Sequence, residues 1–213
     1  MHKSNELIFY GGLGSGHSYK IGLFLTLAQV PHDFRWVDLT QPNELRRADF
    51  QGASKFGEVP VLVDSGQAMC QSNALLIYLA KKTKQFDGGE SQNNWQTALE
   101  WLSWEANRIG FSLPNLRYLS QNKLQAEPVL AYLRARVLAD LGTLNQYLAK
   151  TGFLLPSGFS IADISCSAYL FWLHQVTIEV ANYPYISRWL DAIRALPHWV
   201  HPDEMLKKPI LPQ

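Results

Sequence analysis

A short polar segment near the start of the chain carries the side chains best suited to chemistry. Residues 14–20 read Gly-Ser-Gly-His-Ser-Tyr-Lys and follow the apolar run Leu7–Tyr10. The hydroxyls of Ser15 and Ser18 and the imidazole of His17 stand close together there. A hydrogen bond to a charged partner contributes about 1.5–3 kcal/mol, and a helix N-terminus adds partial positive charge. A helix that begins in this segment would therefore stabilise a bound anion.

A second group of residues surrounds a predicted hairpin. Pro60 begins an apolar run, and an X-Pro bond is the only cheap place for a cis peptide. A cis bond would turn the backbone of Val59 outward to pair with an extended peptide ligand, whereas a trans proline would simply begin a strand. Gln71 and Ser72 precede the next helix, whose free N–H groups attract a carboxylate. Ser72 could alternatively act only as a helix cap.

Hydrophobic periodicity predicts the elements that position these residues. Apolar residues at i, i+3, i+4 and i+7 indicate helices, and short apolar or alternating runs indicate strands. The predicted order is strand 7–10, helix 21–28, strand 34–39, helical stretch 42–50, strands 60–63 and 67–70, and helix 73–82. The first two strands should be parallel, because a helix of βαβ length joins them with a right-handed crossover.

After a polar linker over residues 83–93, the sequence pattern predicts helices only. Predicted helices follow over 95–109, 129–148 and 186–196. Ser160 and Asp163 have the spacing of a capping box ahead of an apolar helix. The predicted fold class is α+β/α, with a βαβαββα domain over residues 1–84 and an all-helical domain over residues 85–213.

Three motifs together resemble the cytosolic glutathione transferase family across nearly the whole chain. They are the segment 14–20, the Gly57–Leu62 run with Gln-Ser-Asn-Ala at 71–74, and Phe-Ser-Ile-Ala-Asp at 159–163. The first motif is similar to the loop of serine-type, bacterial-like members. The resemblance implies a thioredoxin-like glutathione-binding domain followed by a helical-bundle domain.

The resemblance also implies catalytic roles. Ser15 matches the serine that stabilises the thiolate of glutathione, and Ser18 matches a helix N-cap. A free thiol with a pKa near 8.5 is only a few per cent ionised at pH 7. One hydrogen bond to the charged sulfur would lower that pKa by roughly one to two. Ser18, His17 and the strand residue Tyr10 stay open as alternative contacts to the sulfur.

The same resemblance implies which residues of the first domain would bind each part of glutathione. Val59, beside Pro60, would pair with the cysteinyl part, while Gln71 and Ser72 would hold the γ-glutamyl carboxylate. Gln71 stands where many family members have an acid.

Three further expectations concern charged and aromatic residues. Lys55 and Arg46 flank the loop before Val59 and are candidates for the glycyl carboxylate, whereas Lys20 is expected to be a solvated charge. The second-substrate pocket is expected from four residues around the first helix of the second domain, Trp104, Arg108, Phe111 and Tyr118.

The expected reaction is attack by the glutathione thiolate on an electrophilic second substrate, as in detoxification. Glutathione would be the co-substrate and no metal would be needed. A glutathione-dependent isomerase or peroxidase, or a non-catalytic glutathione-binding or interaction module of the same fold, is the alternative. The resemblance also implies a homodimer.

The composition further limits the classes of function that the sequence allows. The net charge of +1 gives no field built for nucleic acid or a membrane surface. No apolar run approaches about 20 residues, and Leu7–Tyr10 is too short for a signal-peptide core, so a cytoplasmic protein is expected. The cysteines Cys70 and Cys166 fit no C-x-x-C pattern, and no cysteine or further histidine joins His198 and His201.

A dinucleotide-binding enzyme is the main rival among other enzyme classes. Gly12 and Gly14 follow a strand and open a helix, but His17 stands where the third glycine should fall. That broken fingerprint argues against a dinucleotide site.

Overall fold

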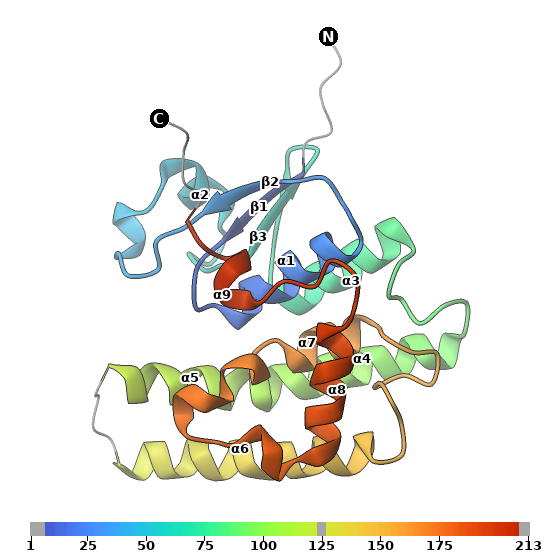
Figure 1. Ribbon diagram of the computed structural model, residues 1–213. Helices are drawn as coiled ribbons and strands as arrows, with labels where there is room; N and C mark the ends of the chain where they lie inside the picture. The colour runs from blue at the N-terminus through green and yellow to red at the C-terminus, as the bar shows by residue number, and fades with distance from the viewer. Residues whose placement is uncertain (1–6, 123–126, 209–213) are drawn as a thin grey trace. The chain divides into compact units, whose positions relative to one another are not determined.

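The computed structural model describes residues 7–122 and 127–208. The chain divides into two compact units, Met1–Lys82 with Pro197–Gln213, and Thr83–Leu196. The first unit contains the sheet and the second is helical (Figure 1). We describe each unit separately.

A four-stranded sheet in the order β2-β1-β3-β4 organises the first unit (Figure 1). Its strands are β1 (Ile8–Gly11), β2 (Asp33–Trp36), β3 (Val61–Asp64) and β4 (Gln67–Cys70). β1 pairs in parallel with β2, and β3 runs antiparallel to both β1 and β4. The predicted parallel pair, the hairpin and the βαβαββα order are confirmed.

Three helices accompany these strands. They are α1 (Gly16–Leu27), α2 (Ala48–Ala53), which a 3-10 turn over Asn43–Leu45 precedes, and α3 (Ser72–Thr83). α1 lies between β1 and β2, α2 lies between β2 and β3, and α3 follows β4. Most of α1 is buried, including the polar residues Ser18 and Lys20, so its buried residues are not confined to one apolar stripe.

The described end of the chain returns to the first unit through α9 (Pro202–Met205). The Tyr19 hydroxyl donates to the Val200 carbonyl at 2.9 Å. Gly22 of α1 has no side chain because a Cβ there would lie 2.5 Å from the Met205 sulfur. These contacts place residues 197–208 with the first unit, whereas the sequence predicts a helical domain over 85–213.

The helical unit contains α4 (Gln92–Asn107), α5 (Ile109–Gln121), α6 (Glu127–Leu148), α7 (Ile161–Ser167) and α8 (Pro184–Arg194), with 3-10 segments over Leu170–Val176 and Val180–Asn182. Sequence analysis did not predict α5, which carries Pro114 in its interior. Ile109, Leu113 and Leu116 nevertheless supply a buried stripe at helical spacing. Burial of that stripe outweighs the hydrogen bond lost at the proline.

The predicted capping box at the start of α7 is present and belongs to a larger buried network. Ser160 accepts from the Ala162 N–H at 3.2 Å, and the Ser160 N–H donates to Asp163 at 2.9 Å. The Leu154 N–H and the Trp189 indole also donate to Asp163, each at 2.9 Å. Burial raises the pKa of Asp163 to about 6, although these hydrogen bonds partly oppose that effect. The carboxylate thus joins α7, α8 and the preceding loop.

Asp64, at the end of β3, has a similar role in the first unit. It is only 5% exposed and accepts hydrogen bonds from the Tyr78 hydroxyl at 2.7 Å and from Ser65 at 3.1 Å. Lys82 forms an ion pair with it. Burial would raise the pKa of Asp64, but the hydrogen bonds from Lys82, Tyr78 and Ser65 outweigh burial, and the pKa is lowered. This carboxylate ties the hairpin to α3.

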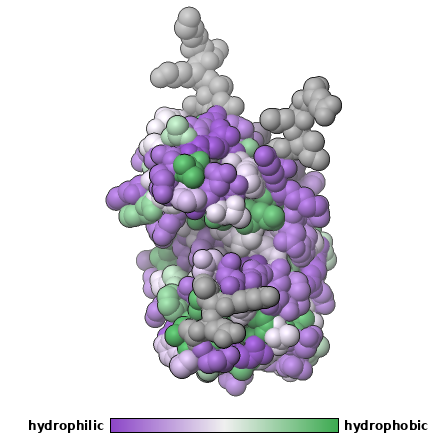
Figure 2. All heavy atoms as spheres, turned by 90° about the vertical axis from the view of Figure 1, so that its left-hand side faces the viewer, coloured by the Kyte–Doolittle hydropathy of each residue, from purple (hydrophilic) through white to green (hydrophobic). Residues whose placement is uncertain are grey.

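On the face shown in Figure 2, hydrophilic residues prevail and hydrophobic ones form small separate patches. Among the described helices, none is long and apolar enough to cross a membrane.

Replacing Asp163 with alanine should destabilise the protein by about 2–4 kcal/mol, because it leaves several buried donors without an acceptor. Urea denaturation followed by circular dichroism measures the change. Asp191→Ala is the matched control, since Asp191 is exposed on α8 and pairs only with Arg194 among the contacts described. Equal midpoints for the two variants would contradict the structural role of Asp163.

The acid limb of the stability profile should depend on Asp64. Because its pKa is lowered in the folded state, its stabilisation is present above about pH 4 and is lost as the pH falls through the folded value. Asp64→Asn should flatten the loss of stability below pH 4, and Tyr78→Phe, which removes one donor, should flatten it less. Urea midpoints measured from pH 2 to pH 7 give both profiles; identical slopes for wild type and Asp64→Asn would refute this assignment.

Candidate functional site

A pocket of about 440 Å³ lies in the first unit. Its lining residues come from the first turn of α1, the segment after β2 and the loop before β3; they are His17, Leu39, Arg46, Gly57, Glu58 and Val59. Sequence reasoning had singled out Val59, Arg46 and His17, but not Leu39 or Glu58.

The loop before β3 shapes one wall of this pocket. The Val59–Pro60 bond is cis, as predicted, and Val59 lines the pocket. Arg46 donates from Nη1 to the Gly57 carbonyl at 2.9 Å. Gly57 has φ +69°, and a Cβ there would lie 2.9 Å from the Asn43 amide nitrogen, so glycine is required. Arg46 therefore both holds the loop and brings a positive charge to the pocket.

The start of α1 forms a second wall, and here Ser15 rather than Ser18 is the helix N-cap. Ser15 is the N-cap, and its hydroxyl accepts from the Ser18 N–H at 3.1 Å. Ser18 is fully buried and accepts from the Gly12 N–H at 3.4 Å. The expectation that Ser18 caps the helix is wrong because α1 begins at Gly16. Ser15 is only half-buried and keeps a hydroxyl proton to donate.

The start of α3 lies against the start of α1. Gln71 has φ 71°, an uncommon left-handed conformation for a residue other than glycine, and its carbonyl accepts from the Leu75 N–H. Ser72 follows as the first helical residue, and its Oγ lies 3.4 Å from His17 Nδ1. Strained backbone of this kind clusters at ligand sites. The two helix N-termini thus meet beside the pocket, through His17 and Ser72.

Lys20 is buried, so the expectation that it is a solvated charge is wrong. It is 0% exposed, and its Nζ donates to Asn73 Oδ1 at 3.0 Å. The reason is its spacing: Lys20 follows His17 by three residues, so both lie on the face of α1 that meets α3. Asn73, to which sequence reasoning gave no role, directly follows the Gln-Ser pair that signalled the site.

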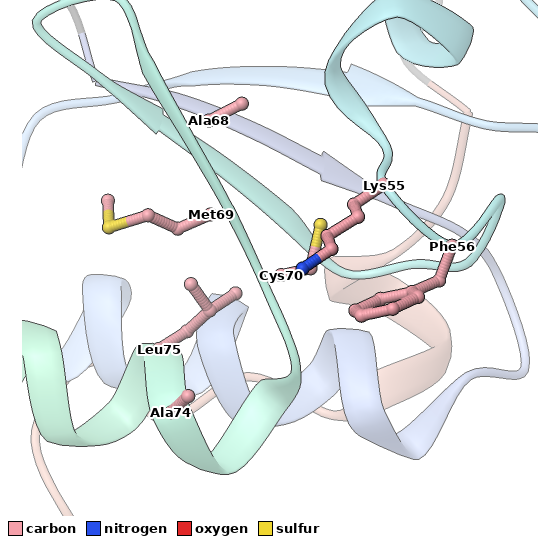
Figure 3. Close-up of a pocket in the computed structure, with 7 residues that line it drawn as sticks. All are labelled: Lys55, Phe56, Ala68, Met69, Cys70, Ala74 and Leu75. Carbon is pink, nitrogen blue, oxygen red and sulfur yellow. The ribbon is translucent and has the colours of Figure 1, made fainter.

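Lys55 lies at a different pocket, of about 300 Å³ (Figure 3). The lining residues are Lys55, Phe56, Ala68, Met69, Cys70, Ala74 and Leu75. The Lys55 ammonium stands 5.2 Å from the centroid of the Phe56 ring. The structure therefore brings Arg46, but not Lys55, to the pocket that Val59 lines.

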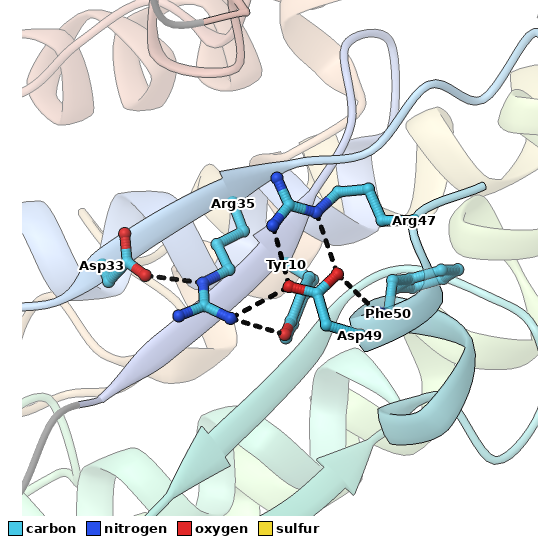
Figure 4. A network of polar contacts seen from close by, with 6 residues as sticks. All are labelled: Tyr10, Asp33, Arg35, Arg47, Asp49 and Phe50. Carbon is cyan, nitrogen blue, oxygen red and sulfur yellow. Dashed lines mark hydrogen bonds and ion pairs between the residues drawn. The ribbon is translucent and has the colours of Figure 1, made fainter.

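Tyr10 is held by a polar network on the sheet (Figure 4). Its ring is buried in a core cluster with Val37, Phe50 and Val61, and its hydroxyl accepts from Arg35 at 3.1 Å. Tyr10 is thus a packed aromatic, and it is not among the residues that line the pocket.

The same network fastens α2. Arg35 also donates to Asp33 and Asp49, and Arg47 donates twice to Asp49 (Figure 4). The Arg47 hydrogen bonds, followed by smaller contributions that include Arg35, hold the pKa of Asp49 well below its usual range. These ion pairs anchor the helix that follows the Arg46 loop.

The four residues expected at a second-substrate pocket lie in the helical unit. Trp104 is on α4, 5.2 Å from Trp101 between ring centroids, and Phe111 and Tyr118 are on α5, 49% and 60% exposed. Arg108 occupies the junction of the two helices.

Arg108 has a buried partner on α6. Its guanidinium lies 3.8 Å from Asp140. Burial raises the pKa of Asp140, although the charges of Arg108 and Arg136 oppose it. Arg108 therefore has a structural contact independent of any substrate.

The histidine pair near the chain end has local partners. His201 accepts from the Asp203 N–H and caps α9, and His198 contacts Gln29 at 3.0 Å. Across residues 7–122 and 127–208, no group of three or more metal-ligating side chains occurs.

Family models match both halves of the chain. The glutathione S-transferase N-terminal domain matches residues 14–82, and the corresponding C-terminal domain matches residues 105–192. A solved glutathione S-transferase from Xanthobacter autotrophicus Py2 is 30% identical with a TM-score of 0.78, over 92% of this chain and 96% of that one. The chain belongs to the glutathione S-transferase family. The serine-type subclass stays a prediction.

Two further relatives of this glutathione S-transferase family member have names other than glutathione S-transferase. The chain is 29% identical over 199 residues to the disulfide-bond oxidoreductase YfcG of Escherichia coli (strain K12), and the match covers 89% of this chain and 90% of YfcG. It is 30% identical over 177 residues to elongation factor 1-gamma of Danio rerio, covering 79% of this chain but only 37% of the factor. Family membership thus spans more than one activity.

Proposed function

We propose that this family member binds glutathione in the pocket lined by His17 and Val59 and ionises its thiol for attack on a second substrate. The observation that carries the proposal is the convergence of Val59, the N-cap Ser15 and the α3 residue Ser72 on one edge of the sheet. Family membership supports glutathione as the ligand.

Each part of glutathione has a partner of suitable chemistry. The cysteinyl backbone would pair with the N–H and C=O of Val59, by strand addition. The γ-glutamyl carboxylate would lie at the N-terminus of α3, against Gln71 and Ser72, where free N–H groups and the helix dipole favour an anion. Arg46 would face the glycyl carboxylate.

Ser15 would donate its hydroxyl hydrogen to the sulfur while its oxygen continues to cap α1. Together with the positive end of α1, that hydrogen bond makes the thiolate common at neutral pH. The thiolate attacks an electrophilic carbon, the sulfur–carbon bond forms and the leaving group departs with its electron pair. Trp104, Arg108, Phe111 and Tyr118 are proposed for the second-substrate region, and a homodimer is proposed by analogy with the family.

Disulfide reduction is a second candidate, favoured by the similarity to YfcG. The same thiolate would attack one sulfur of a disulfide and release the other as a thiolate, and a second glutathione would complete the reduction. Of the two cysteines, Cys70 lines the other pocket and Cys166 is buried in the helical unit. The attacking sulfur would therefore come from glutathione.

Ser15→Ala should raise the thiol pKa of bound glutathione by roughly one to two, because the hydrogen bond to the charged sulfur is lost. Thiolate absorbance in the ultraviolet against pH measures it. Ser91→Ala is the matched control, because Ser91 caps α4 in the same way in the other unit. A lowered thiol pKa in wild type that survives in Ser15→Ala would remove Ser15 from the mechanism. Glutathione bound by wild type with no lowered pKa would favour a non-catalytic binding module.

Ser72→Ala should weaken glutathione binding about tenfold or more, since it removes a donor to a carboxylate, and should leave the thiol pKa of the bound ligand unchanged. Isothermal titration calorimetry gives the dissociation constant. Ser15→Ala should show the opposite pattern, a changed pKa with nearly unchanged affinity. If Ser72→Ala binds as tightly as wild type, the γ-glutamyl carboxylate lies elsewhere.

A further inference from the structure

His17 occupies a position that the proposed roles of Ser15 and Ser72 do not explain. Its side chain lines the pocket with Val59, the proposed partner of the cysteinyl backbone. Its Nδ1 lies 3.4 Å from Ser72 Oγ, at the proposed γ-glutamyl end. It is half-buried on the second residue of α1, two positions after the N-cap Ser15. The imidazole therefore lines the same pocket as Val59, where the cysteinyl part of glutathione is proposed to bind.

Ionisation of the glutathione thiol releases a proton that the serine cannot take up. A hydroxyl oxygen that caps a helix stabilises the thiolate by donating its own hydrogen, but it is far too weak a base to accept another. Imidazole is the side chain whose ordinary basicity suits proton transfer near neutral pH. His17 supplies an imidazole to the lining of this pocket.

We propose that His17 is a catalytic residue, the proton acceptor for the glutathione thiol; this rests on the proposed function. The S–H bond breaks, its electron pair stays on sulfur, and the proton binds His17 Nε2, which produces a thiolate and an imidazolium. Ser72, facing Nδ1, orients the ring. After attack on the second substrate, the imidazolium returns the proton to the leaving atom or to water.

Charged residues of both signs line the pocket together with His17. They are Arg46 and Glu58. Lys20 lies one turn further along α1, with its ammonium on Asn73. A thiolate formed in the same step offsets the new positive charge. Proton transfer and thiolate formation are therefore coupled at His17.

The test counts protons released when glutathione binds. Calorimetric titrations at pH 8 in two buffers of different ionisation enthalpy give that number, and S-methylglutathione, which has no thiol, supplies the background. Ultraviolet absorbance under the same conditions gives the thiolate formed on binding. The decisive quantity is protons released per thiolate formed, in wild type, His17→Asn and His17→Gln. The asparagine amide can replace Nδ1 of His17 as a hydrogen-bonding group, and the glutamine amide can replace Nε2. Neither amide accepts a proton near neutral pH.

Wild type should form thiolate with a ratio near zero, because the enzyme retains the proton. The folded variants should show a ratio near one, or form no thiolate at all. A ratio near one in wild type overturns the role of His17 while the proposed function stands. A ratio near zero in both variants with thiolate present overturns it as well, since another group then holds the proton. Absence of glutathione binding or of thiolate in wild type overturns the proposed function itself, and His17's role with it.

Discussion

The register of the sheet is the constraint on which the site depends. Tyr10 on β1 stands opposite Val61 on β3, and Val61 stands opposite Cys70 on β4. Because β3 runs antiparallel to both neighbours, the chain leaves β1 and β4 and enters β3 at the same edge. The loop to α1, the cis Val59–Pro60 bond and the start of α3 must therefore emerge side by side. A slip of the hairpin by one residue would separate them.

Much of this arrangement was predictable because local rules and tertiary packing agree. Periodicity placed the strands and α1, the Asp-Ser-Gly turn placed the hairpin, and the Ser-x-x-Asp spacing placed the capping box of α7. Val59, Ser72 and Arg46 could be named as site candidates because each adjoins a turn or a helix start. These signals are short in range, so a single sequence contains them.

The features that could not be predicted depend on packing between distant segments. In a glycine-rich loop several residues can begin a helix, so the sequence assigned the N-cap to Ser18, whereas α1 starts at Gly16 and Ser15 caps it. Lysine is exposed by default, and only the proximity of α3 buries Lys20. The proline in α5 conceals a helix that burial alone stabilises. A helix that starts before its first apolar residue, or contains a proline, leaves little local signal.

The return of the chain end to the first unit has a consequence for biosynthesis. The chain leaves the first unit after Lys82 and re-enters it at Pro197, so the helical unit is inserted within the other in topological terms. Every residue of the helical unit is therefore translated before Val200 and Met205. The first unit, by contrast, cannot cover Gly22 and Tyr19 until Val200 and Met205 have been made. The unit whose translation begins first is therefore the last to be completed.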